Sequence, residues 1–181
     1  MIRIVLWLAA LFVGAPAFSA ETLMMDKREV VVNAPIEKVW EAFTTTEGIS
    51  SWAAPGGVVD LRVGGAFELY FDPKAPPGER GMEGTKVLSF VPMQMISFSG
   101  SAPPNFPTVR KEGGPWSVVW FAPADDGKTK LTWWAIVPDR GEEYRKAFAH
   151  AVESQEKWML PLLQKRFTSG PIDWAKLMEK K

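Results

Sequence analysis

The stretch GEEYRKAFAHAVESQEKWMLPLLQKRF, residues 141–167, decides the fold, because its apolar residues recur at helical spacing. The residues that share one stripe are Tyr144, Phe148, Ala151, Trp158 and Leu162, with Val152, Met159 and Leu163 widening it. This spacing predicts one long helix that needs a large apolar surface opposite its stripe. Gln155 interrupts the stripe, and Pro161 lacks a backbone N–H and is expected to kink the last turns.

The surface opposite the helix is expected to come from strands upstream. Strand-like patterns occupy residues 22–33, 58–71, 84–91, 95–100, 116–122 and 130–137. Gly64-Gly65 predicts a bulge or a sharp bend inside the second segment, and Asp125-Asp126-Gly127 predicts a hairpin between the last two. Together these patterns predict a curved antiparallel sheet that grips one helix, with space for a ligand between them.

Two short helices are predicted directly after the first strand. Residues 35–45 carry an amphipathic stripe, with Asn33 as the expected cap and Pro35 in the first turn, and Thr46 is expected to cap residues 47–52. Residues 101–115 contain several prolines and are predicted to form a long, stiff loop. The order of elements therefore predicts an α+β fold with helices on one side of the sheet.

The composition argues against several classes of function. The chain has 181 residues, with 21 Lys and Arg against 21 Asp and Glu, so no basic excess predicts nucleic acid or anionic lipid as a partner. One His and no Cys leave no basis for a His/Cys metal site or a Cys-His nucleophile. No phosphate-cradling or dinucleotide motif is present. We therefore predict no metal, no cofactor and no catalytic residue.

Residues 1–20 are predicted to be a secretory signal peptide. Arg3 precedes an apolar run over residues 4–13. In the region from Ala17 to Ala20, small residues allow cleavage after Ala17 or Ser19, whereas a cut after Ala20 would leave Phe18 at a position that prefers a small residue. The alternative is an uncleaved N-terminal anchor, although the apolar run is short for a membrane span. The mature protein is expected to be periplasmic or secreted, without a stable membrane span. Residues 21–167 are expected to form its domain, and residues 168–181 a tail with a short helix.

Several motifs in order resemble one known superfamily. They are APIEKVWEAFT (34–44), DLRVGGAFEL (60–69), KVLSFVP (86–92), SAPPNFPTVRKE (101–112) and RGEEYRKAFAHAVESQEKW (140–158). This arrangement is similar to the START-like/Bet v 1-like (SRPBCC) superfamily, in its activator-of-Hsp90-ATPase-homologue-like branch. The resemblance implies a helix-grip fold with a cavity between sheet and long helix. It does not select one activity, since the superfamily includes lipid binders, cyclases and chaperone partners.

The main functional signal is the surplus of aromatic residues. The residues expected to line a ligand site are Trp52, Phe67, Leu69, Phe90, Trp116, Trp120, Trp133, Trp158 and, at the mouth, Arg110. The competing interpretation is that the aromatic side chains fill the space and leave a closed core. His150 lies far from the centre of the helical stripe and is expected to be exposed.

Three functions remain open from the sequence. The favoured one is a non-catalytic binder of a hydrophobic or aromatic small molecule. The second is a cyclase- or hydrolase-like enzyme that uses Tyr70, Tyr144 or a buried carboxylate, with Glu68 and Glu83 as a conceivable acid/base pair. The third is a protein-interaction module of the Hsp90-activator-like family. The sequence does not specify the oligomeric state.

Overall fold

The computed structural model describes residues 21–179, so the predicted signal peptide lies outside the described residues. The strands are β1 (Leu23–Val32), β2 (Gly56–Val59), β3 (Phe67–Tyr70), β4 (Gly81–Met82), β5 (Val87–Val91), β6 (Met95–Ser99), β7 (Trp116–Ala124) and β8 (Lys128–Pro138). The helices are α1 (Ile36–Thr44), α2 (Thr46–Ser50), α3 (Pro107–Glu112), α4 (Glu142–Ser154), α5 (Leu160–Ser169) and α6 (Trp174–Met178). A π-helical turn over Gln155–Met159 joins α4 to α5, so residues 142–169 form the long helix that the sequence predicts.

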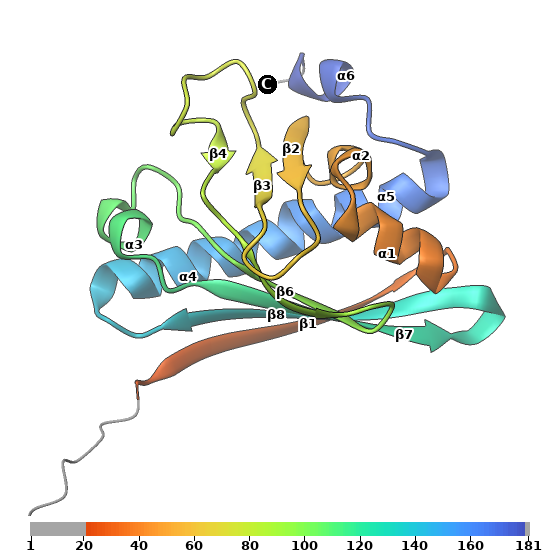
Figure 1. Ribbon diagram of the computed structural model, residues 1–181, viewed down its shortest axis with the longest axis horizontal. Coiled ribbons are helices and arrows are strands. Elements are labelled where there is room, and N and C mark those ends of the chain that lie inside the picture. Colours follow the sequence, from red (N-terminus) through yellow and green to blue (C-terminus); the bar gives the residue numbers. More distant parts are fainter. Residues whose placement is uncertain (1–20, 180–181) are drawn as a thin grey trace, which may run out of the picture.

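Two antiparallel sheets carry the fold. The larger sheet has the strand order β1-β8-β7-β6-β5, and the smaller has the order β2-β3-β4. The long helix crosses one face of the larger sheet, and the smaller sheet stands on that same side (Figure 1). The predicted α+β helix-grip architecture is confirmed.

Strand β8 lies between β1 and β7 in the larger sheet. It pairs with β1 from Leu23↔Pro138 to Val32↔Thr129, and on its other edge it pairs with β7 from Trp116↔Ile136 to Ala124↔Lys128. The β7–β8 connection is the predicted hairpin, with Asp126 and Gly127 both at positive φ. The first and last strands of the domain are therefore neighbours, and the long helix follows directly from β8.

The segment 58–71, predicted as strand broken at Gly64-Gly65, folds as a hairpin. Strands β2 and β3 pair with each other, with Val58 opposite Glu68. The predicted sharp bend is present: Gly64 has a φ of +78°, and a Cβ on Gly65 would lie 2.2 Å from the Asp60 carbonyl oxygen. The bend is therefore tight enough to reverse the chain, so the predicted break at Gly64-Gly65 separates two paired strands.

Three local predictions need correction. The N-cap of α1 is Pro35 without a side-chain bond, not Asn33. The cap of α2 is Thr45, whose hydroxyl accepts from the Gly48 N–H at 2.9 Å, not Thr46. The predicted loop 101–115 contains α3, which begins at Pro107, where the missing N–H of proline costs no helical bond.

An aromatic cluster forms the core between α1, α2 and the larger sheet. Phe43 is its centre, with ring centroids 4.9 Å from Trp52, 5.3 Å from Phe121 and 5.8 Å from Trp133. The indole N–H of Trp52 donates to the Ala42 carbonyl oxygen at 2.9 Å, so this buried polar group is satisfied. The cluster closes one end of the space under the long helix.

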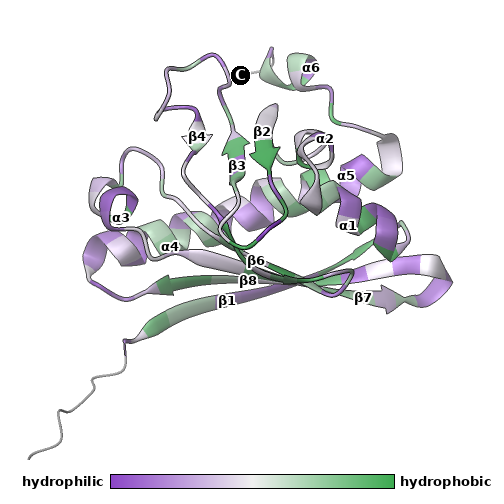
Figure 2. Ribbon diagram, in the orientation of Figure 1, coloured by the Kyte–Doolittle hydropathy of each residue, from purple (hydrophilic) through white to green (hydrophobic). Residues whose placement is uncertain are grey.

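The hydropathy of the elements follows this arrangement. Apolar residues colour β2, β3 and much of the larger sheet, whereas α4 alternates between polar and apolar residues along its length (Figure 2). Within residues 21–179 no helix is long and apolar enough to cross a membrane. The amphipathic pattern of α4 is that of a helix with one face on a core.

Candidate ligand cavity

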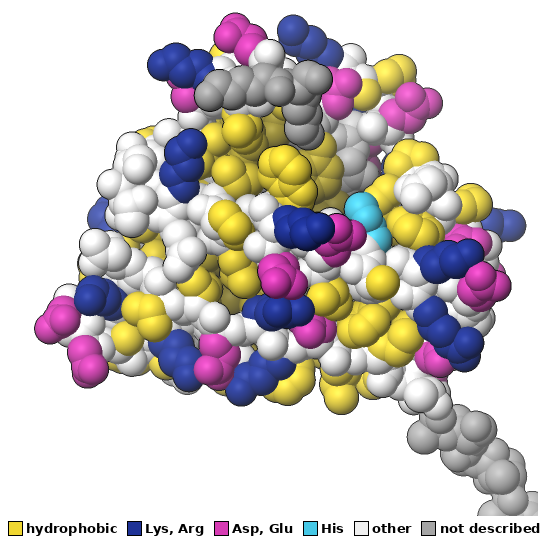
Figure 3. Space-filling model, turned by 180° about the vertical axis from the view of Figure 1, so that it is seen from behind, with side chains coloured by type: hydrophobic (Ala, Val, Ile, Leu, Met, Phe, Trp, Pro, Cys, Tyr) yellow, Lys and Arg dark blue, Asp and Glu magenta, His cyan; other side chains and the backbone are white. Residues whose placement is uncertain are grey.

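A cavity of about 430 Å³ lies between the long helix, the larger sheet and the smaller sheet. This volume falls in the range of roughly 300–1,000 Å³ that is typical of small-molecule sites. Apolar side chains gather in a hollow on the face seen from behind (Figure 3). The aromatic residues that line the cavity are Phe43, Trp52, Phe67, Phe71, Phe98, Trp116 and Trp133.

The cavity exists because its two walls differ in side-chain size. On the sheet side, the Phe67 and Phe98 rings stack at 4.0 Å between centroids and join the two sheets. On the helix side, Ala147 and Ala151 line the cavity one turn apart. Two alanines at this spacing leave open the volume that longer side chains would fill.

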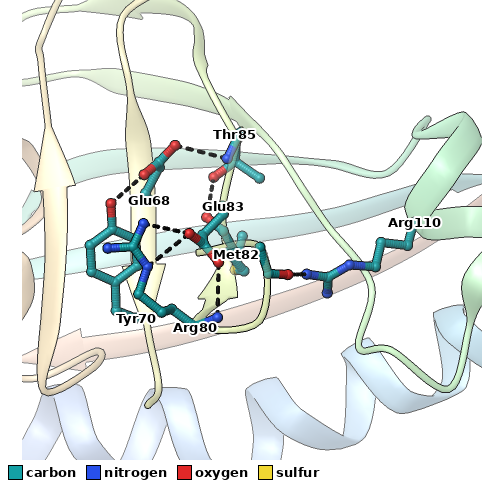
Figure 4. A network of polar contacts seen from close by, with 9 residues as sticks. Glu68, Tyr70, Arg80, Met82, Glu83, Thr85 and Arg110 are labelled. Carbon is teal, nitrogen blue, oxygen red and sulfur yellow. Dashed lines mark hydrogen bonds and ion pairs between the residues drawn. The ribbon is translucent and has the colours of Figure 1, made fainter. Parts of the chain in front are cut away.

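The loop between β3 and β4 and helix α3 both contribute residues to the mouth of the cavity. The Arg110 guanidinium, from α3, lines the cavity and donates hydrogen bonds to the carbonyl oxygens of Ala102, at 3.0 Å, and Gly78. Figure 4 shows Arg110 reaching from α3 toward the segment around β4, where Arg80 precedes the strand and Glu83 follows it. Arg110 therefore ties two segments of the mouth through backbone acceptors.

The carboxylates of the smaller sheet do not form an acid/base pair. Glu68 accepts from the Tyr70 hydroxyl at 2.5 Å, and Glu83 pairs with Arg80 at 2.6 Å (Figure 4). The bond to Glu68 raises the pKa of Tyr70, and the Gly78 and Arg80 N–H groups, with the Arg80 guanidinium, lower the pKa of Glu83. Glu68 and Glu83 each bond to another partner, so they do not form the acid/base pair that the sequence left conceivable.

The other candidate groups for catalysis are also accounted for. Tyr144 is buried outside the cavity, and its hydroxyl contacts Glu112 at 3.0 Å and the Gly113 carbonyl oxygen at 3.1 Å. His150 is exposed, as predicted, although it borders the cavity beside Phe106. Among the described residues no group of three or more His, Cys, Asp or Glu side chains is placed to hold a metal ion.

The structure brings six of the nine predicted site residues to the cavity. They are Trp52, Phe67, Leu69, Trp116, Trp133 and Arg110. Phe90 packs against the core from β5 but does not line the cavity. Trp120 and Trp158 do not line it either, and they are 48% and 51% exposed. Their expected place at the cavity was wrong.

Strand register and the π turn explain the two misplaced tryptophans. On β7, Trp120 pairs with Thr132, whereas Phe121 pairs with Leu131 and turns into the core with it. Trp158 lies in the π turn, which shifts the helical phase and leaves Trp158 outward while Gln155 is buried. Of the two β7 tryptophans expected at the cavity, Trp116 therefore lines it and Trp120 does not.

Sequence reasoning missed several lining residues. Phe98, Ala147, Ala151 and Met159 line the cavity, as does Gln155. Gln155 carried a signal, since it is a polar residue inside an apolar stripe that remains only 6% exposed. The alanines carried none, because an alanine on a helical stripe is equally compatible with close packing.

A curved antiparallel sheet gripping a long helix around an apolar cavity defines the START-like helix-grip class. Within that class, residues 33–160 match the sequence profile described as Activator of Hsp90 ATPase homolog 1-like protein. The chain belongs to this family. No protein with a curated description matches the chain.

Solved structures share the fold at low sequence identity. Protein SSP2350 from Staphylococcus saprophyticus is 17% identical with a TM-score of 0.58, over 82% of this chain and 96% of that one. Protein MLL2253 from Mesorhizobium loti is 18% identical with a TM-score of 0.58, over 87% and 98%. The Aha1 dimer from Colwellia psychrerythraea is 16% identical with a TM-score of 0.55, over 81% and 98%. These likenesses show the fold alone.

Proposed function

We propose that this chain binds an apolar or aromatic small molecule in the cavity between α4 and the two sheets, without transforming it. The observation that carries the proposal is the cavity itself, about 430 Å³ in volume and walled largely by aromatic and aliphatic side chains. A closed core of this composition would be expected to pack without such a space. The apolar lining favours a ligand that leaves water on binding.

The few polar groups at the mouth support binding rather than chemistry. Arg110 satisfies backbone acceptors at the rim, and Arg80 is held by Glu83. Both tyrosines proposed as catalytic groups bond to other protein groups. The spare donors of Arg110 suit a ligand with an anionic or carbonyl group at its outer end.

The proposal includes a place of action. A signal peptide over residues 1–20 would deliver the domain to the periplasm or the medium. There it would meet apolar molecules outside the cytosol. N-terminal sequencing of the protein from its own cells tests this part, with a mature start after Ala17 or Ser19 as the expected result.

A dye titration tests the binding. N-phenyl-1-naphthylamine is neutral and gains fluorescence in apolar surroundings, and we expect saturation near one dye per chain. Ala135→Phe places a ring in the cavity from β8 and should weaken dye binding by about tenfold or more. Ala122→Phe adds the same ring at an exposed position of β7 and is the matched control. Equal affinity in both variants would place the dye elsewhere and reject the proposal.

A further inference from the structure

Two buried polar atoms of the cavity wall have no hydrogen-bond partner. Over residues 21–179 the buried side-chain atoms in this condition are Trp133 Nε1 and Gln155 Oε1. Both residues line the cavity, and they are 5% and 6% exposed. Leaving a buried polar group unpaired is costly, so such atoms are rare and call for an explanation.

The two groups approach the cavity from opposite walls. Trp133 extends from β8, where its ring is held edge-on by Phe43 and Phe98 at 5.8 and 6.2 Å between centroids. Gln155 begins the π turn of the long helix, and its carbonyl oxygen accepts from the Leu160 N–H, five residues on. Irregular turns of this kind occur often at functional sites.

The π turn begins at Gln155, a polar residue on the inward-facing stripe of the long helix. It precedes Pro161, which has no N–H to continue the regular helical ladder. Gln155 lies four residues after Ala151 and keeps the inward phase of the stripe, whereas the turn shifts the phase after it and leaves Trp158 outward. A leucine at position 155 would fill the same place without an unpaired oxygen, so packing alone does not account for the glutamine.

We infer that the ligand carries a hydroxyl group that bonds to Gln155 and Trp133. An indole N–H only donates, so Trp133 needs an acceptor. A glutamine amide presents either its oxygen or its NH₂ group, and a hydroxyl group satisfies both because it donates and accepts. The ligand class is therefore an apolar alcohol or phenol. This inference rests on the proposed function of the cavity.

The binding motion is local. Both atoms are covered by the wall in the present conformation. The Gln155 side chain has three rotatable bonds and turns toward a hydroxyl group. The Trp133 ring is held by its aromatic neighbours, so the side chains that cover its N–H must move aside for the hydroxyl group to reach it. Binding of the hydroxyl group therefore gives both buried polar groups the hydrogen-bond partners that they lack in the ligand-free protein.

The test compares naphthalene with 2-naphthol, two ligands that differ by one hydroxyl group. In the unaltered protein, we expect 2-naphthol to bind more tightly than naphthalene. In Gln155→Leu and in Trp133→Phe, the ratio of the naphthalene Kd to the 2-naphthol Kd should fall by about tenfold, because each substitution removes a hydrogen bond to the hydroxyl group whatever it does to the apolar contacts that both ligands share. Gln164→Leu, at an exposed position of α5, is the control for loss of a glutamine.

The binding results distinguish the hydroxyl assignment from the underlying proposal that the cavity binds a ligand. Equal binding of the two ligands, or a preference that survives both substitutions, overturns the hydroxyl assignment and leaves the cavity proposal standing. No binding of either ligand to the unaltered protein, together with no binding of the neutral dye, rejects both the hydroxyl assignment and the cavity proposal.

Thermal unfolding of ligand-free Gln155→Leu gives a second readout: its Tm should equal or exceed that of the unaltered protein, because an unpaired buried acceptor has been removed. A large fall in Tm would show that Gln155 already stabilises the ligand-free protein and would overturn the hydroxyl assignment.

Discussion

Glu143 holds Thr108 by both of its carboxylate oxygens, with 2.6 Å from Oε1 to the Thr108 N–H nitrogen and 2.7 Å from Oε2 to the Thr108 hydroxyl. Oε1 also accepts from the Val109 N–H at 3.2 Å. One carboxylate in the first turn of α4 therefore caps the start of α3. Because α3 carries Arg110 to the cavity mouth, this contact links the long helix to the cover of the cavity.

Removing that carboxylate should loosen α3. In Glu143→Ala, the amide hydrogens of Thr108 and Val109 should exchange with solvent at least about tenfold faster, since they lose their acceptor. Hydrogen exchange followed by NMR measures this. Glu142→Ala is the control, because Glu142 pairs with Lys146 on α4 itself. Unchanged protection in Glu143→Ala would show that α3 is held by its other contacts.

Arg110 should control the rate at which a ligand enters and leaves. Arg110→Met removes the bonds to Ala102 and Gly78 that tie the mouth segments together. We expect both association and dissociation of N-phenyl-1-naphthylamine to accelerate by severalfold in stopped-flow measurements. Lys111→Met changes the neighbouring residue, which does not line the cavity, and should leave both rates alone. Equal association and dissociation rates in Arg110→Met and Lys111→Met would show that Arg110 does not control passage through the mouth of the cavity.

Neighbouring residues of β7 should differ sharply in their effect on stability. Phe121→Ala removes a ring that lies 5.3 Å from both Trp40 and Phe43 in the core, and should cost about 3–5 kcal/mol of unfolding free energy. Trp120→Ala removes a half-exposed ring on the opposite face and should cost about 1 kcal/mol or less. Urea unfolding compares them. Similar costs would contradict the assigned faces of β7.

Glu29 should make stability depend on pH at acid pH. Hydrogen bonds from Lys130 and Lys27 lower the pKa of Glu29 from 4.5 to about 2. A lowered pKa means that the folded state favours the charged form. The contribution is therefore complete above pH 4.5 and is lost as the pH falls toward 2. Because the group is exposed, its effect should be modest and should shrink in about 0.5 M salt.

Glu29→Gln provides the comparison. Between pH 5 and pH 2, the Tm of the unaltered protein should fall more steeply than that of Glu29→Gln at low salt. Parallel curves for the two proteins would show that the two lysines do not stabilise the charged carboxylate.

The sequence predicts the order of elements well because their patterns are local. The stripe of residues 141–167 and the Asp125-Asp126-Gly127 turn each depend on residues close in the chain. The inward face of β7 does not, because Val118 and Trp120 on one side and Val119 and Phe121 on the other are all apolar. Pairing with β8, which sets Val119 beside Trp133, decides that face.

The site was predictable only in part for the same reason. Aromatic residues on the inner faces, such as Phe67 and Trp133, were found from composition and alternation. The π turn was not, because it depends on how Pro161 and the wall of the cavity are accommodated together. That turn moves Trp158 off the expected stripe while Gln155 stays on it, so a residue predicted as a fault in the stripe belongs to the cavity wall.

The indole N–H resonances of the tryptophans test the central claim most directly. They are assigned by single Trp→Phe substitutions and followed in ¹H–¹⁵N spectra during titration with N-phenyl-1-naphthylamine. Binding in the cavity predicts shifts for Trp52 and Trp133, which line it, and none for Trp120, which lies on the exposed face of β7. Shifts confined to Trp120, or no shifts at a dye concentration that saturates fluorescence, would contradict a ligand site between the long helix and the sheets.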